Sequence, residues 1–375
     1  MKKRILVVAG EVSGDLHAAG LIQELQKMTS DLEFFGIGGD KMKSCGVKSL
    51  FHINQLSVLG FWEVLKHLNF FRRVKNQLLA EVEASSCHLA ILVDYPGFNL
   101  RLAADLKKRS IPIVYYISPQ IWAWGEKRIE KIKKYVGKMI VFFPFEEELY
   151  RRHSVKVEFV GHPSLELAIP TLSRKQFCDL IGVNESEKLI GLFPGSRIQE
   201  VKQHLPVMAQ AAGIIRSQLG NFQFLVGLAP GIDKDFVKSL LPSNSPIGIS
   251  EGHNYEIMKY SEILLVKSGT STVEAALSGT PFVVMYKTSP ISYFIARRVV
   301  KISNLAMANI LVGKKIVPEF IQNLATPEKI ATESVSILKD QARYLKIKEE
   351  LQGMRGRLGT GNAYRKAAQA VAELI

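Results

Sequence analysis

Cysteine is scarce in this sequence. Only Cys45, Cys87 and Cys178 occur in 375 residues, and no Cys-x-x-Cys pair is present. An odd number of widely spaced cysteines predicts neither a disulfide framework nor a zinc site. The cysteine content therefore fits a reducing compartment such as the cytosol, and the residue pattern indicates no metal and no other cofactor.

A long apolar run is also missing. No stretch approaches the roughly 18 apolar residues of a membrane-spanning helix. The apolar run Ile5–Ala9 is followed by Glu11 and Asp15, so it is too short for a signal peptide and predicts a first strand instead. We therefore expect any membrane contact to be peripheral.

Acidic residues are outnumbered. The chain has 49 Lys and Arg against 35 Asp and Glu, a formal net charge of +14. Such an excess favours an anionic partner: nucleic acid, an anionic membrane face or phosphorylated substrates. Nucleic acid is the weakest of these readings, because aromatic residues do not interleave with the basic run Lys127–Lys138 as a stacking platform requires. That run could also be a solvated helix face.

Strand and helix patterns alternate along the chain, which predicts parallel sheets with crossover helices. With 47% apolar and 22% charged residues over this length, two globular domains are expected. The fold class is therefore α/β, with two doubly wound halves and a helical tail. Apolar runs predict strands at Ile5–Ala9, Phe34–Asp40, Leu89–Val93, Ile113–Ile117, Met139–Phe143, Lys188–Phe193, Phe222–Leu228, Ile247–Ile249, Ile263–Val266 and Phe282–Tyr286.

The stretch Ser268–Pro281 has the pattern of a phosphate-binding turn. It lies between a predicted strand and a helix start, whose unpaired N–H groups favour an anion. Glu274, about one turn into the helix, could accept both hydroxyls of a ribose. We interpret the stretch as the seat of a nucleotide-sugar diphosphate; an ordinary capped turn is the alternative. The turn residues are Ser268, Gly269, Thr270 and Ser271.

Two further turns follow predicted strands. In the second half, Ser196 and Arg197 lie in a turn of small residues, and Arg197 could make forked hydrogen bonds to phosphate. In the first half, the turn after Ile5–Ala9 is not Gly-x-Gly-x-x-Gly, and its carboxylates would repel phosphate. We expect it to meet sugar hydroxyls or to shape an acceptor pocket through Glu11, Ser13 and Asp15.

Asp94 directly follows the predicted strand Leu89–Val93. Open α/β sheets bind ligands at the carboxyl ends of their strands. A carboxylate in that place is therefore a candidate for chemistry.

The stretch Leu56–Leu79 carries more bulky apolar side chains than a one-faced helix needs, with basic residues near one end. That pattern is typical of an interfacial helix. Each apolar side chain entering lipid would contribute roughly 1.5–3 kcal/mol, and each nearby cation about 1 kcal/mol. A core helix is the alternative, and both readings hold if only one face is buried. The expected membrane or acyl-chain contacts are Leu59, Phe61, Trp62, Leu65, Phe70, Phe71, Arg72 and Arg73.

The domain boundaries follow from these patterns. The segment from His162 to about Thr171 carries two prolines and is interpreted as a linker. We expect an acceptor- and membrane-facing domain over residues 1–165 and a nucleotide-sugar-binding domain over residues 166–325. A helix is predicted to begin at Pro318–Gln322, and helices over residues 326–375 could pack back on an N-terminal domain.

Several short motifs together resemble one known family, the lipid-A-disaccharide synthases. These are inverting glycosyltransferases with the GT-B fold, two Rossmann-like domains facing each other across a cleft. The resemblance runs from Ile5 to about Gln322, with mild departures at Ala18 and Ala308. Its motifs are Gly10-Glu11-x-Ser13-Gly14-Asp15, Gly36-x-Gly38-Gly39, Asp94-Tyr95-Pro96-x-Phe98-Asn99, Ser118-Pro119-Gln120-x-Trp122-Ala123-Trp124, Phe145-Glu146, Gly161-His162-Pro163, Pro194-Gly195-Ser196-Arg197-x-x-Glu200, Ser268-Gly269-Thr270 with Glu274, and Asn309.

The resemblance implies a reaction and its partners. UDP-2,3-diacylglucosamine would donate its sugar to the 6-hydroxyl of 2,3-diacylglucosamine 1-phosphate (lipid X), giving a β-1,6 disaccharide 1-phosphate and UDP. The partners would be this lipid-linked UDP-sugar donor, the phosphorylated glycolipid acceptor and the anionic inner face of the cytoplasmic membrane. The location would be cytoplasmic and peripheral. No nucleic acid, cofactor or metal is implied, and a homodimer stays open, because the tail could pack on a partner subunit.

The resemblance also implies site roles. Inversion needs a base that takes the acceptor proton, for which Asp94 is the first choice and His17 the alternative; His17 could instead pack at a helix start. Arg197 and the turn Ser268–Ser271 would stabilise the charge on UDP, and Glu274 would hold the ribose. The donor or its phosphates would also contact Asn309 and Gln322.

Other readings remain. A different UDP-sugar enzyme of the same fold, such as a muramyl-lipid glycosyltransferase or a UDP-N-acetylglucosamine 2-epimerase, would share the nucleotide seat. The apolar stretch Leu56–Phe71 argues against the epimerase, whose substrate is soluble. A non-catalytic protein that docks on an anionic membrane through its charge is the reading from another class.

Overall fold

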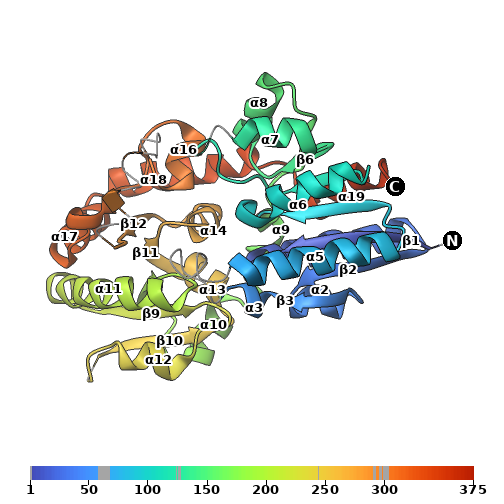
Figure 1. Cartoon of the computed structure of the whole chain (residues 1–375). Coiled ribbons are helices and arrows are strands. Elements are labelled where there is room, and N and C mark those ends of the chain that lie inside the picture. The colour runs from blue at the N-terminus through green and yellow to red at the C-terminus, as the bar shows by residue number, and fades with distance from the viewer. Residues whose placement is uncertain are drawn as a thin grey trace. The chain divides into compact units, whose positions relative to one another are not determined.

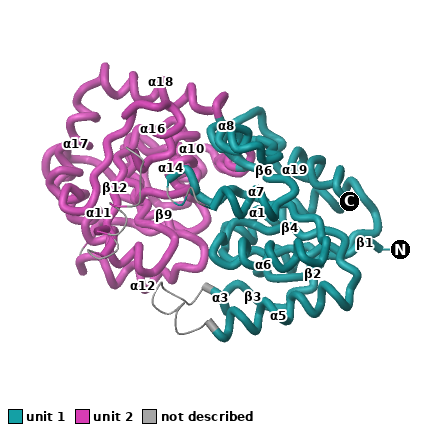
Figure 2. The backbone as a smooth tube through the Cα atoms, turned by 45° about the horizontal axis from the view of Figure 1, so that its top comes forward, with its two compact units in different colours: residues 1–163, 358–375 teal, residues 164–357 magenta. Residues whose placement is uncertain are grey.

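The computed structural model of the chain describes residues 2–57, 68–123, 125, 128–243, 245–289, 293, 294, 298 and 304–375. The chain forms two compact units, one made of Met1–Pro163 with Leu358–Ile375 and the other of Ser164–Arg357 (Figure 2). Each unit is built on one parallel sheet with helices on its faces (Figure 1). The predicted α/β class with two doubly wound sheets is confirmed.

The first sheet has seven strands in the order β3-β2-β1-β4-β5-β6-β7, all paired in parallel. Residues Ile5–Ala9 and Leu89–Val93 are buried throughout, as expected for central parallel strands covered on both faces. The strands are β1 Lys3–Ala9, β2 Leu32–Gly38, β3 Lys48–His52, β4 Leu89–Val93, β5 Ile113–Tyr116, β6 Lys138–Val141 and β7 Val157–Phe159.

Two helical layers cover the first sheet. One apolar cluster joins the sheet to α5, α6, α7 and α8, and a second joins its other face to α1, α2 and α19. The helices of this unit are α1 Val12–Met28, α2 Asp40–Ser44, α3 Ile53–Ser57, α5 Leu68–Ala84, α6 Pro96–Lys108, α7 Arg128–Tyr135, α8 Pro144–Arg152 and α19 Ala363–Ala372.

The second sheet has six parallel strands in the order β10-β9-β8-β11-β12-β13. Its strands are β8 Lys188–Phe193, β9 Phe222–Leu228, β10 Ile247–Glu251, β11 Ser261–Lys267, β12 Phe282–Tyr286 and β13 Glu319–Ile321. Helices α11 and α17 pack together, and α14 packs against α13 and α18 (Figure 1). The helices are α9 Ser164–Leu167, α10 Arg174–Ile181, α11 Ile198–Leu219, α12 Lys234–Ser239, α13 Asn254–Tyr260, α14 Ser271–Ser278, α16 Met307–Val312, α17 Pro327–Lys339 and α18 Gln341–Arg357, with a 3-10 turn at Gln322–Leu324.

The C-terminal part differs from the sequence-based expectation. The prediction of a helix beginning at Pro318 is wrong: Glu319–Ile321 form the edge strand β13 beside β12. Residues 326–375 do form helices: α17 and α18 belong to the second unit, and α19 packs on α1 in the first. In the part of the chain that the structure describes, no helix has the length and apolar character needed to cross a membrane.

Candidate active site

Each sheet has a place where the strand order reverses. In the first sheet, β1 lies beside β4, and Ala9 is paired with Val93. The turns that begin at Gly10 and Asp94 therefore leave the same edge of the sheet, while the helices that follow them cover opposite faces. Open α/β sheets bind ligands at this kind of reversal. The structure thus brings together two of the turns that the sequence singled out.

The backbone at Asp94 is strained and firmly held. Asp94 has a φ of 44° and Tyr95 one of 48°, two consecutive non-glycine residues in the left-handed region. The carbonyl of Asp94 accepts hydrogen bonds from the Tyr115 hydroxyl at 2.5 Å and from the Asn99 amide at 2.8 Å. Strained backbone that surrounding bonds enforce is concentrated at functional sites. The Asp94 side chain is half-buried.

Gly10 leaves room for the neighbouring turn. A Cβ at this position would lie 2.2 Å from Cγ of Tyr95, so only glycine lets the Tyr95 ring cover the turn. Burial and the nearby Glu11 carboxylate both raise the pKa of Tyr95. Glu11 therefore lies close to the Asp94–Tyr95 turn, and Ser13, in the first turn of α1, is exposed.

His17 is buried beneath this edge of the sheet. Its Nδ1 lies 2.9 Å from the hydroxyl oxygen of Tyr364 on α19, and its ring meets the Phe142 ring edge-on at 5.2 Å. Burial lowers the pKa of His17 to about 4. The His162 ring contacts the same Phe142 ring at 5.5 Å, and its pKa is lowered to about 3 by burial and by the neighbouring His17. Both imidazoles are therefore neutral near pH 7.

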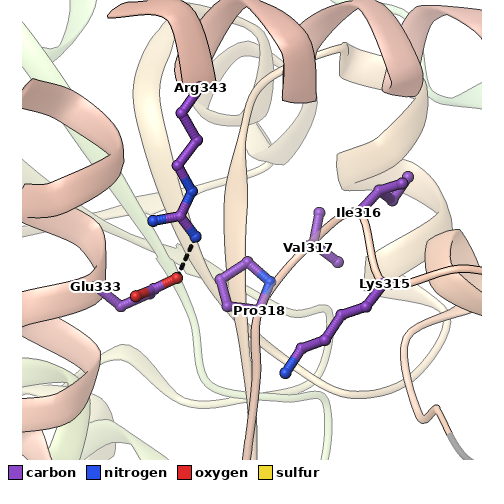
Figure 3. A pocket seen from close by; sticks show the side chains of 6 residues that line it. All are labelled: Lys315, Ile316, Val317, Pro318, Glu333 and Arg343. Carbon is purple, nitrogen blue, oxygen red and sulfur yellow. Dashed lines mark hydrogen bonds and ion pairs between the residues drawn. The ribbon is translucent and has the colours of Figure 1, made fainter. Parts of the chain in front are cut away.

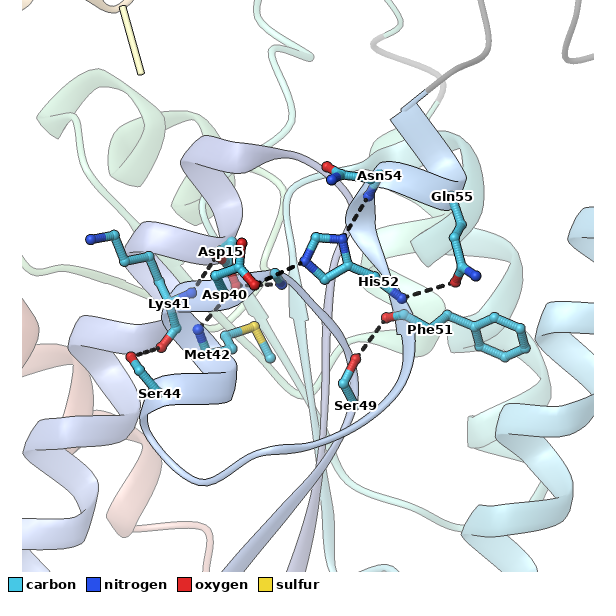
Figure 4. A network of polar contacts seen from close by, with 11 residues as sticks. Asp15, Asp40, Lys41, Met42, Ser44, Ser49, Phe51, His52, Asn54 and Gln55 are labelled. Atoms are coloured by element: carbon cyan, nitrogen blue, oxygen red, sulfur yellow. Dashed lines mark hydrogen bonds and ion pairs between the residues drawn. The ribbon is translucent and has the colours of Figure 1, made fainter. Parts of the chain in front are cut away.

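Asp15 has a structural role in the fold. Its Oδ1 accepts hydrogen bonds from the backbone N–H groups of Gly39 at 2.6 Å and Met42 at 3.1 Å, and its Oδ2 from that of Lys41 at 3.0 Å (Figure 4). These groups belong to the start of α2, whose first N–H groups have no partner within the helix. Asp15, which the sequence placed in a ligand pocket, thus caps α2 from a distance and is almost fully buried.

The second sheet reverses between β8 and β11, where Phe193 is paired with Val266. Glu200, in the first turn of α11, connects the two turns that leave this edge. Its Oε2 accepts a hydrogen bond from the N–H of Ser196 at 3.1 Å, and its Oε1 pairs with Nζ of Lys267 at 2.8 Å. Burial alone would raise the pKa of Glu200, but Lys267, the N–H of Ser196 and Arg197 together lower it. A Cβ at Gly195 would lie 2.6 Å from this carboxylate, which requires glycine there.

The turn after β11 is open to solvent on one side. Gly269 and Thr270 are exposed, as are Ser196 and Arg197 in the turn after β8. The expected helix start is confirmed, since α14 begins at Ser271. An anion at this edge would meet the α14 terminus and the Arg197 guanidinium together.

Glu274 lies one turn into α14, with its carboxylate surrounded mostly by protein. The hydroxyl of Tyr255 donates a hydrogen bond to its Oε1 at 3.3 Å. Burial raises the pKa of Glu274 to about 7, and the bond from Tyr255 opposes that rise. The side chain thus changes charge in the physiological range.

Asn309 and Gln322, the two expected donor contacts, bond to backbone. The Asn309 side chain is fully buried, and its amide pairs with the main chain of Ile316 and Val317. The Gln322 amide accepts from the N–H of Thr288 at 2.8 Å and donates to its carbonyl at 3.1 Å. The Asn309 amide therefore holds the segment before β13, and the Gln322 amide holds the segment after β12.

The expected membrane contacts are described only in part. Leu59, Phe61, Trp62 and Leu65 lie outside the described residues. Phe70 and Phe71 are half-buried and pack on the first unit's core, with Phe71 6.2 Å from the Phe98 ring. Arg72 and Arg73 are exposed on α5.

One cavity of about 270 Å³ lies away from these turns (Figure 3). The segment Lys315–Pro318 lines it together with Glu333 of α17 and Arg343 of α18, which form an ion pair. Because Pro318 directly precedes β13, the outermost strand of the second sheet, the cavity lies beside that strand and not at the β8–β11 reversal. None of its lining residues was predicted to bind substrate.

Sequence reasoning missed four polar residues near these turns: Glu200 and Lys267, which connect them, Glu319, which bonds Asn309, and Tyr364, which contacts His17. Only Glu200 had a signal, as part of a shared motif without a role. Nothing in the sequence pairs Tyr364 with a residue 347 positions away.

Comparisons with known proteins agree with this architecture. A profile of the family described as "Lipid-A-disaccharide synthetase" matches residues 5–374. The chain is 39% identical over 378 residues to the lipid-A-disaccharide synthase of Trichlorobacter lovleyi, with 100% of this chain and 98% of the relative covered.

Two solved structures are similar over nearly their whole length. The UDP-GlcNAc 2-epimerase of Neisseria meningitidis bound to UDP-GlcNAc gives a TM-score of 0.65 at 15% identity, with coverage of 99% and 98%. The glycotransferase of kitacinnamycin gives 0.65 at 14%, with coverage of 100% and 99%. At these identities the likeness shows the fold alone.

Proposed function

The chain belongs to the lipid-A-disaccharide synthase family, and from that premise we propose which residues carry out the glycosyl transfer. The enzyme is a glycosyltransferase of lipid A biosynthesis with a GT-B-like fold. It condenses UDP-2,3-diacylglucosamine with 2,3-diacylglucosamine 1-phosphate, and UDP leaves. The full-length family match is the observation that carries this conclusion.

Asp94 is the base in this proposal. In an inverting transfer the acceptor's 6-hydroxyl oxygen forms a bond to the anomeric carbon while the bond from that carbon to UDP breaks. The hydroxyl proton passes to a carboxylate oxygen of Asp94, and the bonding electrons leave with UDP. A half-buried carboxylate on a strained, firmly held turn at the sheet reversal supports this role, and a positioned base contributes about 10²–10⁴ in rate.

His17 has a different role in the proposal. The His17 ring is buried, and its Nδ1 is occupied by the contact with the Tyr364 hydroxyl. We therefore assign it to positioning the Gly10–Ser13 turn. The alternative, that His17 itself is the base, is tested by the Asp94→Asn variant below. Glu11 and Ser13, at the start of α1, would meet the acceptor sugar, while Asp15 fixes α2 behind them.

The turns of the second sheet would hold the nucleotide. The turn Ser268–Ser271 at the start of α14 would bind the diphosphate, and Arg197 beside Ser196 would take up the charge that develops on UDP. Glu274 would accept the ribose hydroxyls. Asn309 and Gln322 would act on this seat through the loops that they hold.

Membrane association is the next part of the proposal. Helices α5, α6 and α7 pack side by side over one face of the first sheet. Together they carry ten Lys and Arg against four Asp and Glu. Each cation near an anionic surface contributes about 1 kcal/mol. The exposed cations of this basic layer are Arg72, Arg73, Arg101, Lys107, Lys108, Lys131, Lys133 and Lys134.

Such a layer would hold the enzyme peripherally on the cytoplasmic face of the inner membrane, where acylated substrates lie. Leu59, Phe61, Trp62 and Leu65, which lie outside the described residues, would add acyl contacts in this proposal. A homodimer is a further part of the proposal. In it, α19 of one copy would pack on α1 of the other copy, as it packs here on α1 of its own chain.

A UDP-release assay tests the function. Purified enzyme with UDP-2,3-diacylglucosamine and 2,3-diacylglucosamine 1-phosphate should release UDP and form a disaccharide 1-phosphate. Omission of the acceptor should abolish release. UDP-GlcNAc that is epimerised without acceptor would favour an epimerase, and binding to anionic vesicles without any turnover would favour a docking protein.

A further inference from the structure

Glu319, the first residue of β13, collects an unusual number of hydrogen bonds. Its Oε1 accepts from the N–H of Ala306 and from Nδ2 of Asn309, each at 2.8 Å. The N–H of Leu305 lies 3.1 Å and 3.0 Å from its two carboxylate oxygens. Hydrogen bonds to an ionised acceptor are the strong ones. One carboxylate at the sheet edge thus fixes the chain where it enters α16.

Asn309 extends this clamp. Its Oδ1 accepts hydrogen bonds from the N–H groups of Ile316 at 2.8 Å and Val317 at 3.0 Å, and its Nδ2 donates to the Val317 carbonyl at 2.9 Å as well as to Glu319. The side chain is fully buried. Asn309 therefore connects Glu319 to the segment before β13 and has no hydrogen-bonding group left for a ligand.

The segment 305–307, which Glu319 holds, contacts the turn Ser268–Thr272 that is proposed to bind the nucleotide. The carbonyl of Leu305 accepts a hydrogen bond from the Ser268 hydroxyl at 3.2 Å. The N–H of Met307 donates to Oγ1 of Thr272 at 3.3 Å, and that hydroxyl donates to the Gly269 carbonyl at 2.7 Å. Two hydrogen-bonded steps thus lead from Glu319 to each end of the Ser268–Thr272 turn.

We propose that Glu319 is a positioning residue for nucleotide binding: its carboxylate, through Asn309 and the backbone of 305–307, sets the orientation of the Ser268–Thr272 turn. Gly269 and Thr270 at the tip of the turn are exposed, and the 305–307 segment bonds the turn at both of its ends, Ser268 and Thr272. The inference rests on the proposed placement of the UDP diphosphate at this turn.

The test is Glu319→Gln in the full-length enzyme, with UDP as the probe. The amide keeps the size but turns one of its atoms into a donor that faces other donors. We expect the Kd for UDP, measured by calorimetry, to rise about tenfold, or about 1.4 kcal/mol, with kcat at saturating donor changed less than about threefold. Glu349→Gln, an exposed carboxylate on α18, is the matched control and should change neither.

A double-mutant cycle separates positioning from general loss of stability. If Glu319 acts through Leu305 on Ser268, the effects of Glu319→Gln and Ser268→Ala on the UDP Kd are not additive, whereas independent effects add. An unchanged UDP Kd in Glu319→Gln, or additive effects, would overturn the inference. If Glu319→Gln does not fold, Glu319→Asp, which is too short to reach all three N–H groups, replaces it with the same expectations.

Two other variants test separately whether the nucleotide binds at the Ser268–Thr272 turn. If Arg197→Ala and Ser268→Ala both leave the UDP Kd unchanged, the nucleotide does not bind at this turn and the proposed function of the turn fails. If those variants weaken UDP binding and Glu319→Gln does not, the seat stands and the positioning role alone fails.

Discussion

The Nδ1 atom of His17 lies 2.9 Å from the hydroxyl oxygen of Tyr364, although 347 residues separate them in the chain. The Tyr364 ring lies over Gly20 of α1, where a Cβ would approach its Cζ to 2.7 Å. The last helix of the chain, α19, therefore contacts a candidate site residue in the first helix, α1. His17 is neutral near pH 7, and this contact holds its ring in place, with either the Tyr364 hydroxyl or Nδ1–H as the donor.

Tyr364→Phe should lower kcat while leaving UDP binding intact. The change removes the hydroxyl that orients His17 but keeps the ring on Gly20. A hydrogen bond of this kind contributes about 1 kcal/mol, so we expect a five- to tenfold fall in turnover, on the order of that energy, with an unchanged Kd for UDP. Tyr135→Phe, half-buried on α7, is the control; equal turnover in the two variants would contradict a role for the contact.

The two buried histidines should make the first unit acid-sensitive. Their pKa values are lowered to about 4 for His17 and about 3 for His162, from 6.5. The unfolded chain therefore binds protons that the folded chain does not. The contribution of these two histidines to the free energy of unfolding is fully present above about pH 6.5 and is lost as the pH drops towards 4. The slope approaches about 1.4 kcal/mol per pH unit for each histidine.

Urea unfolding midpoints between pH 7 and pH 4.5 measure this effect. The free energy of unfolding of His17→Gln should fall less steeply with decreasing pH than that of the wild type. The two slopes should differ by the contribution of one histidine, up to about 1.4 kcal/mol per pH unit. His88→Gln, at an exposed histidine with no such burial, should leave the slope unchanged. Because burial raises the pKa of Glu146 to about 8 and that of Glu274 to about 7, these carboxyls stabilise the fold as the pH falls and oppose the histidines, so the comparison between variants decides. Equal slopes in His17→Gln and the wild type would show that His17 is protonated in the fold.

Asp94→Asn tests the proposed base. Asparagine also tolerates the left-handed backbone, so the φ of 44° should persist. We expect turnover to fall at least about 100-fold with little change in the UDP Kd. Asp31→Asn is a matched control, because Asp31 is an exposed aspartate with a φ of 66°. Near-normal turnover in Asp94→Asn would remove Asp94 as the base and return His17 to that role.

The sequence predicts the central strands well and the edge strands poorly. Strands such as Leu89–Val93 and Phe282–Tyr286 are continuous apolar runs, because both faces of a parallel sheet are covered. The missed strands β3, β7 and β13 are short and only partly buried, so their residues give no apolar run. The erroneous helix at Pro318 has this cause: the strand there is three residues long.

The candidate site divides in the same way. Local patterns place Asp94 and the Ser268 turn, since a strand followed by small or acidic residues is visible in the sequence. The partners that fix these turns are distant in the chain: Lys267 is 67 residues from Glu200, and Glu319 is 10 from Asn309 but on another element. Their pairing depends on which strands are neighbours, and this information is absent from any single stretch.

The basic layer of α5, α6 and α7 should control vesicle binding. Reversing Lys131, Lys133 and Lys134 to Glu should weaken binding to phosphatidylglycerol vesicles at least about 100-fold, since each cation contributes about 1 kcal/mol. Reversing Lys175, Lys234 and Lys238, exposed lysines of the second unit, changes the net charge equally. If both triple variants lose binding to the same extent, net charge and not this layer attracts the enzyme to the membrane.

Glu274 should make UDP binding pH-dependent through the ribose. Its pKa is raised to about 7 by burial, from 4.5, so the folded state holds the proton more tightly and ionisation costs stability as the pH rises from 4.5 to 7. A ribose that donates two hydroxyls needs the ionised form. The UDP Kd should therefore rise towards tenfold per pH unit below about 7.

Because the phosphates of UDP also titrate, 2′,3′-dideoxy-UDP is the reference ligand, and the ratio of the two Kd values isolates the ribose. For the wild type, UDP should bind about tenfold more tightly than the dideoxy ligand at pH 8.5, and this preference should shrink at pH 5.5 as Glu274 becomes protonated. In Glu274→Gln the preference should be small and independent of pH, since an amide offers one acceptor at every pH. If the ratio of the two Kd values for the wild type is the same at both pH values, the ribose of UDP does not bind at Glu274.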